Sequence, residues 1–372
     1  MQSVTSFLKN KFSEYYEKNL GKIRAPECLD NREFGFLLFK KGVMVRHKGF
    51  KTIESARNYM KMINPSDIYY STAYYEKPEA PMDKKNWLGA DLVFDIDADH
   101  LETSCRILHD KWICENCGYS GKGIAPNSCL KCGTERLKTD SWVCEKCLDE
   151  AKKEVLKLID MLISDFGLQP NNLHSYFSGH RGYHLHVNAE QTRMLGDDER
   201  KEIVDYILGV GLDVQLYNLK NIETMLKELE LNESGWKGRI TRGYYRHLNE
   251  IKKGSRQAKF KHKEILRKII TENSARIDTV VTTDTHRLIR MPETLHGKTG
   301  LRAVKVDINN LEGFDPFKES LAWKGNMNVF VLESPRFRIK DEEYGPYKKE
   351  KVNLPTTAAI LLLCKGKALL KC

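Results

Sequence analysis

Two aspartates interrupt a short apolar stretch, LVFDID at residues 92–97, that otherwise has the composition of a buried β-strand. Side chains alternate between the two faces of a strand, so Asp95 and Asp97 are expected side by side, with Cα atoms roughly 7 Å apart. The opposite face would carry Leu92, Phe94 and Ile96. Two carboxylates this close repel each other, and burial adds a desolvation cost. The fold must therefore place a positive group, either basic side chains or a metal ion, against this face.

Composition supports a folded chain without a membrane span. The 372 residues are 41% hydrophobic, enough for a substantial core, and suit one large domain or two to three ordinary ones. The longest apolar run, AAILLLC at 358–364, is too short to cross a membrane. The N-terminus has no long apolar signal core and is expected to form an amphipathic helix with Val4, Phe7, Leu8 and Phe12 inward. We therefore expect a soluble intracellular protein.

The positive charge is concentrated in one segment. Between Lys237 and Lys268 there are 12 Lys and Arg against two Glu, which accounts for the net charge of +10. Aromatic and histidine residues alternate with these charges, namely Tyr244, Tyr245, His247, Phe260 and His262. Such a segment favours a polyanionic partner, first of all nucleic acid. A solvated helical face without a ligand is the alternative.

Hydrophobic periodicity predicts an α+β core with two inserts. A helix is expected at 148–166, ending before Gly167. Strands are expected at 31–50 (two strands around a Lys-Lys-Gly turn), 67–78, 90–97 and 173–187 (two strands around a glycine turn), and in IDTVVTTD, AVKVDI and MNVFVLE beyond residue 276. Polar helices are expected at 197–231 and 256–273. The inserts are a cysteine-rich segment before the 148–166 helix and the basic helical segment.

Six of the ten cysteines form three Cys-x-x-Cys pairs. Each pair supplies two thiolates, and tetrahedral zinc needs four ligands. The spacing favours one structural site of Cys114, Cys117, Cys129 and Cys132. The third pair would be completed upstream, giving Cys105, His109, Cys144 and Cys147, although any two pairs could be combined. An iron–sulfur cluster is an alternative, and a disulfide framework is disfavoured without a secretion signal. Cys28, Cys364 and Cys372 are isolated.

Two further segments carry groups suited to phosphate. In SGHRGYH, Gly179 and Gly182 allow close backbone approach, and Ser178, Arg181 and His184 offer donors. The segment 276–300 contains another acid in a predicted strand, Asp278, followed by His286, Arg287, Arg290, His296 and Lys298. Taken alone, each of these residues could equally be a surface charge, a cap or part of a hairpin. Together, three aspartates could hold two divalent ions for phosphoryl transfer, and the cations could neutralise a triphosphate.

These motifs together resemble the small catalytic subunit of archaeal and eukaryotic DNA primases, most closely the archaeal members. The resemblance runs from residue 32 to about 301 through REFGF, LVFDID, a Cys-x-x-Cys leading into a long helix, DFGL, YFSGHRGYHLHV and VTTDTHRLIRMPETLHGKTGL. It implies an α+β catalytic core with an RRM-like mixed sheet, a zinc-binding insert and a small helical subdomain. The core would comprise 1–104, 148–195 and 274–372 (the last with a C-terminal segment), the insert 105–147 and the basic helical subdomain 196–273.

The resemblance also implies a role for each matching residue. Asp95, Asp97 and Asp278 would bind catalytic Mg²⁺ or Mn²⁺, with Asp278 assigned because it stands 18 residues before His296. Asp99 is left outside this set. Nucleotide phosphates would be contacted by Ser178, Arg181, His184, Arg290, His296, Lys298 and Arg32. The family's zinc site would be Cys105, His109, Cys144 and Cys147. The segment from Trp112 to Asp140 is inserted within it, so the second zinc site is inferred from spacing alone.

The activity implied is de novo synthesis of short primers on a single-stranded DNA template by two-metal nucleotidyl transfer. The expected partners are nucleoside triphosphates, the template and a primase large subunit in a heterodimer, in the cytoplasm of an archaeon or the nucleus of a eukaryote. A repair or translesion polymerase of the same superfamily would instead extend existing ends. A nuclease would leave the cations without a role. A non-catalytic zinc-dependent nucleic-acid binder would be indifferent to alanine at the aspartates.

Overall fold

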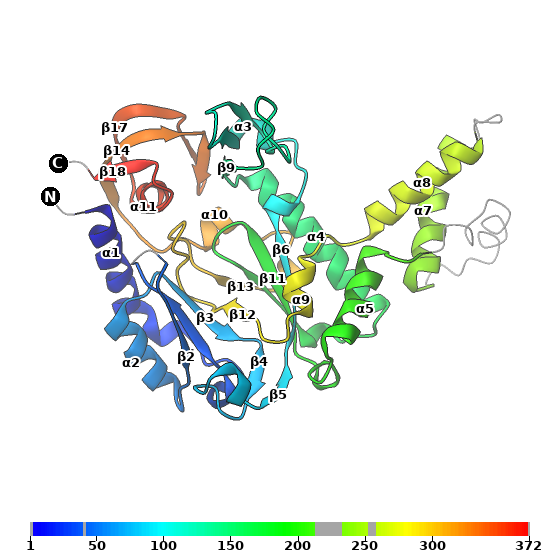
Figure 1. The fold of residues 1–372 in the computed structure, drawn as a ribbon, viewed down its shortest axis with the longest axis horizontal. Coiled ribbons are helices and arrows are strands. Elements are labelled where there is room, and N and C mark those ends of the chain that lie inside the picture. The colour runs from blue at the N-terminus through cyan, green and yellow to red at the C-terminus, as the bar shows by residue number, and fades with distance from the viewer. Residues whose placement is uncertain (1–2, 40–41, 213–232, 252–257, 371–372) are drawn as a thin grey trace.

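The computed structural model describes residues 3–39, 42–212, 233–251 and 258–370, which form a mixed α/β fold. Two four-stranded sheets form its centre, and all their neighbouring strands are antiparallel (Figure 1). The first sheet has the order β12 (Leu288–Arg290), β3 (Asp67–Ser71), β1 (Phe34–Leu37) and β2 (Met44–Lys48). The second has the order β13 (Val304–Val306), β10 (Leu173–Phe177), β11 (Gly182–Val187) and β6 (Leu92–Asp97). A separate pair joins β4 (Ala73–Tyr75) to β5 (Trp87–Ala90).

The strand β6 alternates its faces as LVFDID predicts. Leu92, Phe94 and Ile96 are buried in one hydrophobic cluster, whereas Val93 belongs to a second cluster that includes residues of the first sheet. Helix α4 (Glu145–Ser164) covers the second sheet, packing against β11 and β6. Its buried side chains recur at helical spacing, namely Val155, Leu158, Ile159 and Leu162. Each large apolar side chain buried here contributes roughly 1.5–3 kcal/mol, so β6 is held firmly between two cores.

Helices α1 (Val4–Asn19) and α2 (Ile53–Ile63) pack against each other beside the first sheet. The N-terminal helix is amphipathic as predicted: Leu8 and Phe12 are buried, and Val4 and Phe7 are partly buried against the core. The apolar run at 358–364 lies in the buried helix α11 (Thr356–Cys364), which packs against α1. No helix among the described residues is long and apolar enough to span a membrane.

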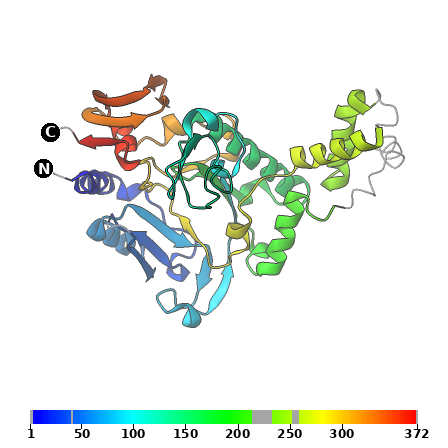
Figure 2. The same cartoon turned by 45° about the horizontal axis from the view of Figure 1, so that its top comes forward.

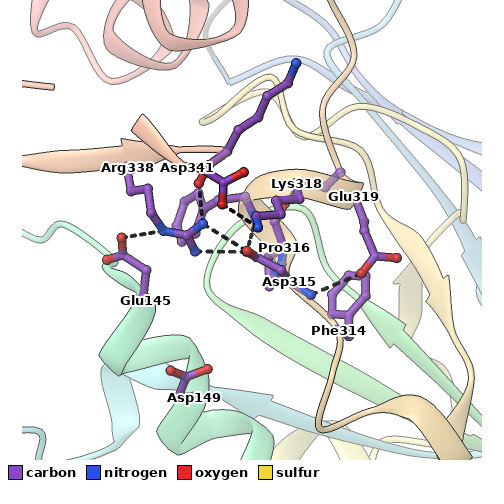
Figure 3. A network of polar contacts seen from close by, with 12 residues as sticks. Glu145, Asp149, Phe314, Asp315, Pro316, Lys318, Glu319, Arg338 and Asp341 are labelled. Carbon is purple, nitrogen blue, oxygen red and sulfur yellow. Dashed lines mark hydrogen bonds and ion pairs between the residues drawn. The ribbon is translucent and has the colours of Figure 1, made fainter. Parts of the chain in front are cut away.

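The C-terminal lobe is a small antiparallel sheet with the order β17 (Tyr347–Pro355), β14 (Asn326–Ser334) and β18 (Ala368–Leu370), accompanied by the hairpin β15 (Phe337–Ile339) and β16 (Glu342–Tyr344). Arg338 of β15 connects this lobe to the core (Figure 3). Its Nε lies 3.0 Å from Glu145 Oε1 at the start of α4, and its Nη1 lies 2.9 Å from Asp315 Oδ2, which precedes the short helix α10 (Pro316–Glu319). The lobe is thus attached beside the first turn of α4.

Three helices extend away from the sheets on one side of the molecule (Figures 1 and 2). They are α5 (Asp197–Leu208), α7 (Gly235–Ile251) and α8 (Ala258–Asn273), and α7 packs against α8. The helical prediction for 197–231 is confirmed for α5, and its continuation over 213–231 lies outside the described residues. Of the two tyrosines in the basic segment, Tyr244 is fully buried, whereas Tyr245 is 67% exposed. Phe260 and His262 lie where no side chain is described.

One predicted strand is wrong. Residues 279–283 form the short helix α9 (Thr279–Thr283), with Asp278 as its N-cap. The N–H groups of Val280 and Val281 donate to Asp278 Oδ1 at 3.0 and 3.4 Å. This capping begins a helix where the run of β-branched residues favours a strand. The other predicted strands in this part of the chain correspond to β13 and β14.

Candidate active site

The three candidate acids lie together at one edge of the second sheet. Asp95 and Asp97 share a face of β6, which is an edge strand, and α9 lies against the same strand. The backbone N–H of Asp278 donates to the backbone oxygen of Asp95 at 2.8 Å, which fixes the start of α9 beside β6. Across the sheet, Asp95 is paired in register with His184 and Asp97 with Gly182.

Burial and mutual repulsion perturb these acids. Burial and the negative charge of Asp278 raise the pKa of Asp95 to about 6. Burial and the charge of Asp95 raise the pKa of Asp97 to about 6, although Arg181 acts in the opposite direction. Asp95 Oδ1 is buried and has no hydrogen-bond partner among the described residues. The ring nitrogen His184 Nε2 lies 3.6 Å away, and burial lowers the pKa of this histidine to about 4, so the ring brings no charge. A buried carboxylate oxygen without a donor is an unfavourable arrangement that a bound cation would relieve.

Asp95 and Asp97 line a cavity of about 180 Å³ whose other walls are rich in cations and donors, whereas Asp278 lies outside this lining. Side chains from the β10–β11 turn and from the segment that begins with β12 line this cavity. Every nucleotide-binding candidate except Arg32 lines it, namely Ser178, Arg181, His184, Arg290, His296 and Lys298. His180 and Arg287 also line it, so three histidines, three arginines, a lysine and a serine hydroxyl face the carboxylates across a small polar space. This combination is suited to a phosphate group held next to a metal ion.

The glycine turn between β10 and β11 brings backbone close to the acids. Ser178 Oγ accepts hydrogen bonds from the N–H groups of His180 at 3.4 Å and Gly182 at 3.3 Å. A Cβ at Gly182 would lie 2.2 Å from the backbone oxygen of Ile96 and 2.4 Å from Asp97 Oδ1. Only glycine therefore allows β11 to pair this closely with the acid-bearing end of β6.

Arg181 extends from this turn to the acids. Its Nε lies 2.9 Å from Asp97 Oδ2 and its Nη1 lies 2.7 Å from Asp99 Oδ2. Asp99, which lies just beyond β6 in a short 3₁₀ segment, therefore orients this guanidinium. The Arg181 side chain remains 31% exposed, so solvent or a ligand can still reach it.

His296 is a neutral donor in the cavity wall. The backbone N–H of Lys298 donates to His296 Nδ1 at 3.1 Å, which assigns the ring proton to Nε2. Burial, followed by the charge of Arg290, holds the pKa of His296 well below its usual range. Its ring packs on that of His180, with centroids 4.7 Å apart. His296 can therefore donate one hydrogen bond from Nε2 without carrying a charge.

Sequence reasoning missed Asp67, the first residue of β3. Its carboxylate is 4% exposed, lies 2.8 Å from Arg290 Nη1 and accepts the N–H of Gly297 at 3.0 Å. Arg290 also donates from Nη2 to the hydroxyl of Tyr69 at 3.0 Å. Asp67 thus holds both the guanidinium and the loop of His296 in place. In the sequence, Asp67 is an acid at the start of a strand that is otherwise largely apolar. An acid in an apolar strand is also what singled out Asp95, so the same signal could have identified Asp67.

Arg32 does not reach the cavity. Its guanidinium is 1% exposed and contacts Asp91 Oδ2 at 2.7 Å. Its remaining donors bond the backbone oxygens of Glu27, Ser71 and Thr72 at 3.0, 2.9 and 2.6 Å. All donor nitrogens are therefore occupied within the fold, and we remove Arg32 from the nucleotide site. His286 also lies outside the cavity lining and stacks on Tyr75, with ring centroids 6.0 Å apart.

Two clusters of sulfur and nitrogen ligands lie in the cysteine-rich insert. The ligand atoms of each cluster lie within 4.8 Å of one another. One cluster is Cys105, His109, Cys144 and Cys147, and the other is Cys114, Cys117, Cys129 and Cys132. This is the grouping that the spacing favours, and each cluster could hold one metal ion.

The environment of His109 suits a metal ligand. Its Nδ1 lies 2.8 Å from Asp110 Oδ1, which leaves Nε2 directed at the sulfur atoms, 3.4 Å from Cys147 Sγ. Asp110 is itself held by the N–H of Trp142 at 3.0 Å and by Arg106 Nε at 2.7 Å. A carboxylate behind a histidine in this way fixes the ring orientation and raises its basicity as a ligand.

The raised pKa values of Asp95 and Asp97 predict a pH-dependent response to divalent ions. Unfolded aspartates have a pKa near 3.8, so between pH 4 and 6 the folded acids retain protons that the unfolded chain has lost. Their contribution to stability therefore falls as the pH rises through 6 and stays low above it. We expect Mn²⁺ to raise the melting temperature more at pH 7.5 than at pH 5, because at pH 5 the ion must displace protons.

The buried His184 and His296 have lowered pKa values and act in the opposite direction. The comparison of wild type with the Asp95→Asn/Asp97→Asn variant isolates the contribution of the acids. In this variant the shift caused by Mn²⁺ should disappear at both pH values. An equal Mn²⁺ shift at pH 5 and pH 7.5 in the wild type would contradict the prediction.

Known proteins that are similar to this chain give evidence that does not depend on the geometry of the cavity. A protein-family model described as DNA primase small subunit matches residues 134–308. The chain is similar to three archaeal proteins named DNA primase small subunit PriS. That of Nitrosopumilus maritimus is 34% identical over 367 residues, 96% of each chain. That of Cenarchaeum symbiosum is 35% identical over 371 residues, and that of Archaeoglobus fulgidus 35% over 380 residues, each alignment covering 97% of both chains.

Proposed function

The chain belongs to the family of DNA primase small subunits, and we propose that the cavity beside β6 is where this catalytic subunit transfers nucleotides. The protein is a nucleotidyltransferase of DNA replication, and a repair polymerase is not favoured by its relatives. The reaction proposed for the cavity is de novo synthesis of short primers on single-stranded DNA. The observation that carries the assignment is the buried, unpartnered oxygen of Asp95 facing a cation-lined space.

The acids supply the proposed metal site. We assign Asp95, Asp97 and Asp278 as ligands, because their oxygens are hard donors of the kind that Mg²⁺ and Mn²⁺ prefer. When bound, two such ions would favour the deprotonated 3′-hydroxyl and offset negative charge on the reacting phosphates. The raised pKa values of Asp95 and Asp97 then matter, because the residues must lose their protons before they bind a cation.

The opposite wall would bind the triphosphate. Lys298 and Arg290 bring fixed positive charge, and His296 donates a neutral hydrogen bond from Nε2. The hydroxyl of Ser178 organises the glycine turn, and Arg181 lies between that turn and Asp97. His184, paired opposite Asp95, completes the contacts. Asp67 acts as a positioning residue because it holds Arg290 and Gly297 without lining the cavity.

Each cysteine cluster is proposed to bind one structural zinc ion. Sets of four thiolates, or of three thiolates and one imidazole, are typical zinc ligands and leave no open position for water. The packing of Cys105 and Cys147 in the hydrophobic core supports this structural role.

Membership of the primase family supports three further proposals, on the partners, on the second sheet and on the basic segment. The partners would be nucleoside triphosphates, a single-stranded DNA template and a primase large subunit. The second sheet, covered by α4, would be the RRM-like sheet implied by the resemblance, although its strand pairs are all antiparallel and the prediction of a mixed sheet is wrong. On α7 and α8, exposed Tyr245, Arg246, Lys263 and Arg267 support a role of the basic segment in holding nucleic acid.

The test is primer synthesis on a single-stranded DNA template with nucleoside triphosphates, Mg²⁺ or Mn²⁺ and no primer. We expect short oligonucleotides made de novo by the purified chain. A parallel reaction receives an annealed primer. Extension of that primer without any de novo product, even after addition of the large subunit, would replace the proposal with the polymerase alternative.

A further inference from the structure

A second, larger cavity lies outside the candidate active site. It has a volume of about 680 Å³ and separates the cysteine-rich insert from the C-terminal lobe, which neighbour each other in both views (Figures 1 and 2). The insert contributes a small sheet with the order β8 (Ser120–Lys122), β7 (Lys111–Cys114) and β9 (Leu137–Asp140). Five lysines but only one acid, Asp140, line the cavity, and we call these the groove lysines: Lys111, Lys122, Lys138, Lys365 and Lys367.

Strand register puts three groove lysines on one face of the insert sheet. Lys111 is paired with Lys122 on one side and with Asp140 on the other. Ile113, two residues along the same face, is paired with Lys138. Like charges directly opposite each other destabilise a sheet, and the charge of Lys111 is offset by Glu333 of β14 at 2.6 Å. Lys122 and Lys138 are exposed and form no ion pair with any residue in the described part of the chain, so their charges are available to a ligand.

The other two groove lysines come from the C-terminal lobe. Lys367 forms an ion pair with Asp140, which closes one side of the groove. Lys365 caps the end of α11, and its ammonium lies 5.2 Å from the ring centre of Trp142. Burial lowers the pKa of Lys365 to about 8, assisted by repulsion from Lys367, Arg181 and Lys298.

Helix α11, which is capped by Lys365, packs against the loop that carries Lys298, because a Cβ at Gly300 would lie 2.6 Å from Ile360 Cγ2. The groove therefore lies next to the active-site cavity. Arg181 and Lys298 line the cavity of the acids, and Lys365 lines the groove, so positive charge continues from one to the other. Burial lowers the pKa of both His180 and His296, and the charge of Lys365 acts in the same direction. A chain of phosphates running from the active site along the groove would offset the repulsion among these groups.

We propose that the groove lysines bind the phosphate backbone of a single nucleic-acid strand as it passes the active site. This inference rests on the proposed function, and it adds a binding surface formed by the insert sheet and the C-terminal lobe together. The strand is the unpaired DNA template, because a growing primer is base-paired with the template along its length. A sequence-independent contact is expected, because lysines on an open sheet face meet phosphates rather than base edges.

The test uses the full chain with Lys122→Glu and Lys138→Glu combined. The matched control is Lys9→Glu with Lys51→Glu, which makes the same charge change at exposed lysines of the N-terminal region that form no ion pair among the described residues. Fluorescence anisotropy measures the affinity for a labelled dT oligomer and for the same oligomer paired with its complement over a range of salt concentrations. This binding measurement requires no catalysis, so it remains informative even if primer synthesis fails.

We expect the groove variant to bind about tenfold more weakly at low salt and its salt slope to fall by roughly 1.4, about 0.7 for each lost phosphate contact. The loss is expected to be greater for the single strand than for the duplex, and a loss as great for the duplex would overturn the assignment to the unpaired template. Nucleoside triphosphate affinity should stay unchanged. The charge-neutral pair Lys122→Gln/Lys138→Gln repeats the test if the reversal lowers the melting temperature. Affinities and slopes equal to those of the control for both oligomers would overturn the proposal.

Discussion

Replacing Asp95 by asparagine is expected to abolish nucleotide incorporation without unfolding the protein. Asparagine keeps the shape of the side chain but removes the charge, and metal-dependent phosphoryl transfer loses several kcal/mol of transition-state stabilisation without its ligand. We expect incorporation to fall by at least about 10³-fold, since every 1.4 kcal/mol is a factor of ten in rate. Melting temperature in the absence of divalent ions should stay the same or rise, because the variant relieves the repulsion among Asp95, Asp97 and Asp278.

The control for this experiment is Asp83→Asn, which removes the charge of an exposed aspartate outside the cavity. Its incorporation rate should match that of the wild type. Incorporation by Asp95→Asn at more than a few hundredths of the wild-type rate would show that the buried carboxylate does not hold an essential ion. A large fall in melting temperature would instead assign Asp95 a role in the fold.

The second large effect is expected at the cysteine cluster in the core. Cys147 is 2% exposed, lies in the first turn of α4 and packs in the same hydrophobic cluster as Leu101 and Trp142. Structural zinc binding contributes about 10–16 kcal/mol in small domains, so loss of one ligand should remove a large share of the stability of this region. We expect Cys147→Ser to lose one zinc ion per chain, to melt at a much lower temperature and to lose primer synthesis.

The second cluster provides the contrast. Cys132 is exposed, and the cluster lies on the inserted segment rather than in the core. Cys132→Ser should also lose one zinc ion per chain, but it should leave the main thermal transition nearly unchanged. Zinc content measured by atomic emission, together with calorimetry, checks both variants, and Cys28→Ser is the control for a lone cysteine. Equal destabilisation by Cys147→Ser and Cys132→Ser would contradict the distinction between the clusters.

Short sequence patterns predicted most of the structural features that position the residues of the active-site cavity. The alternation in LVFDID, the Ser-Gly-x-Arg-Gly turn and the cysteine spacing depend on neighbours in sequence, and the structure has all three as predicted. The strand predicted at 279–283 is wrong because a side-chain cap outweighed β-propensity. Arg32 was misplaced because a buried arginine paired with a distant aspartate has the same sequence signal as one that binds phosphate. Asp67 carried a signal in its own strand, but its partners Arg290 and Gly297 are distant in sequence. His180 became visible only once the structure had brought it against His296.

The placement of Asp278 also has a consequence for timing during synthesis of the chain. The strand β6 leaves the ribosome early, yet its outer edge is covered by α9, and the first sheet is completed only when β12 pairs with β3. Both events require segments that are translated much later, and domains fold as units during synthesis. A nascent chain that ends before Asp278 therefore has two aspartates but no complete cavity. The cavity can therefore be completed only after Asp278 and β12 have been translated. Truncated products of translation are expected to be inert rather than partly active.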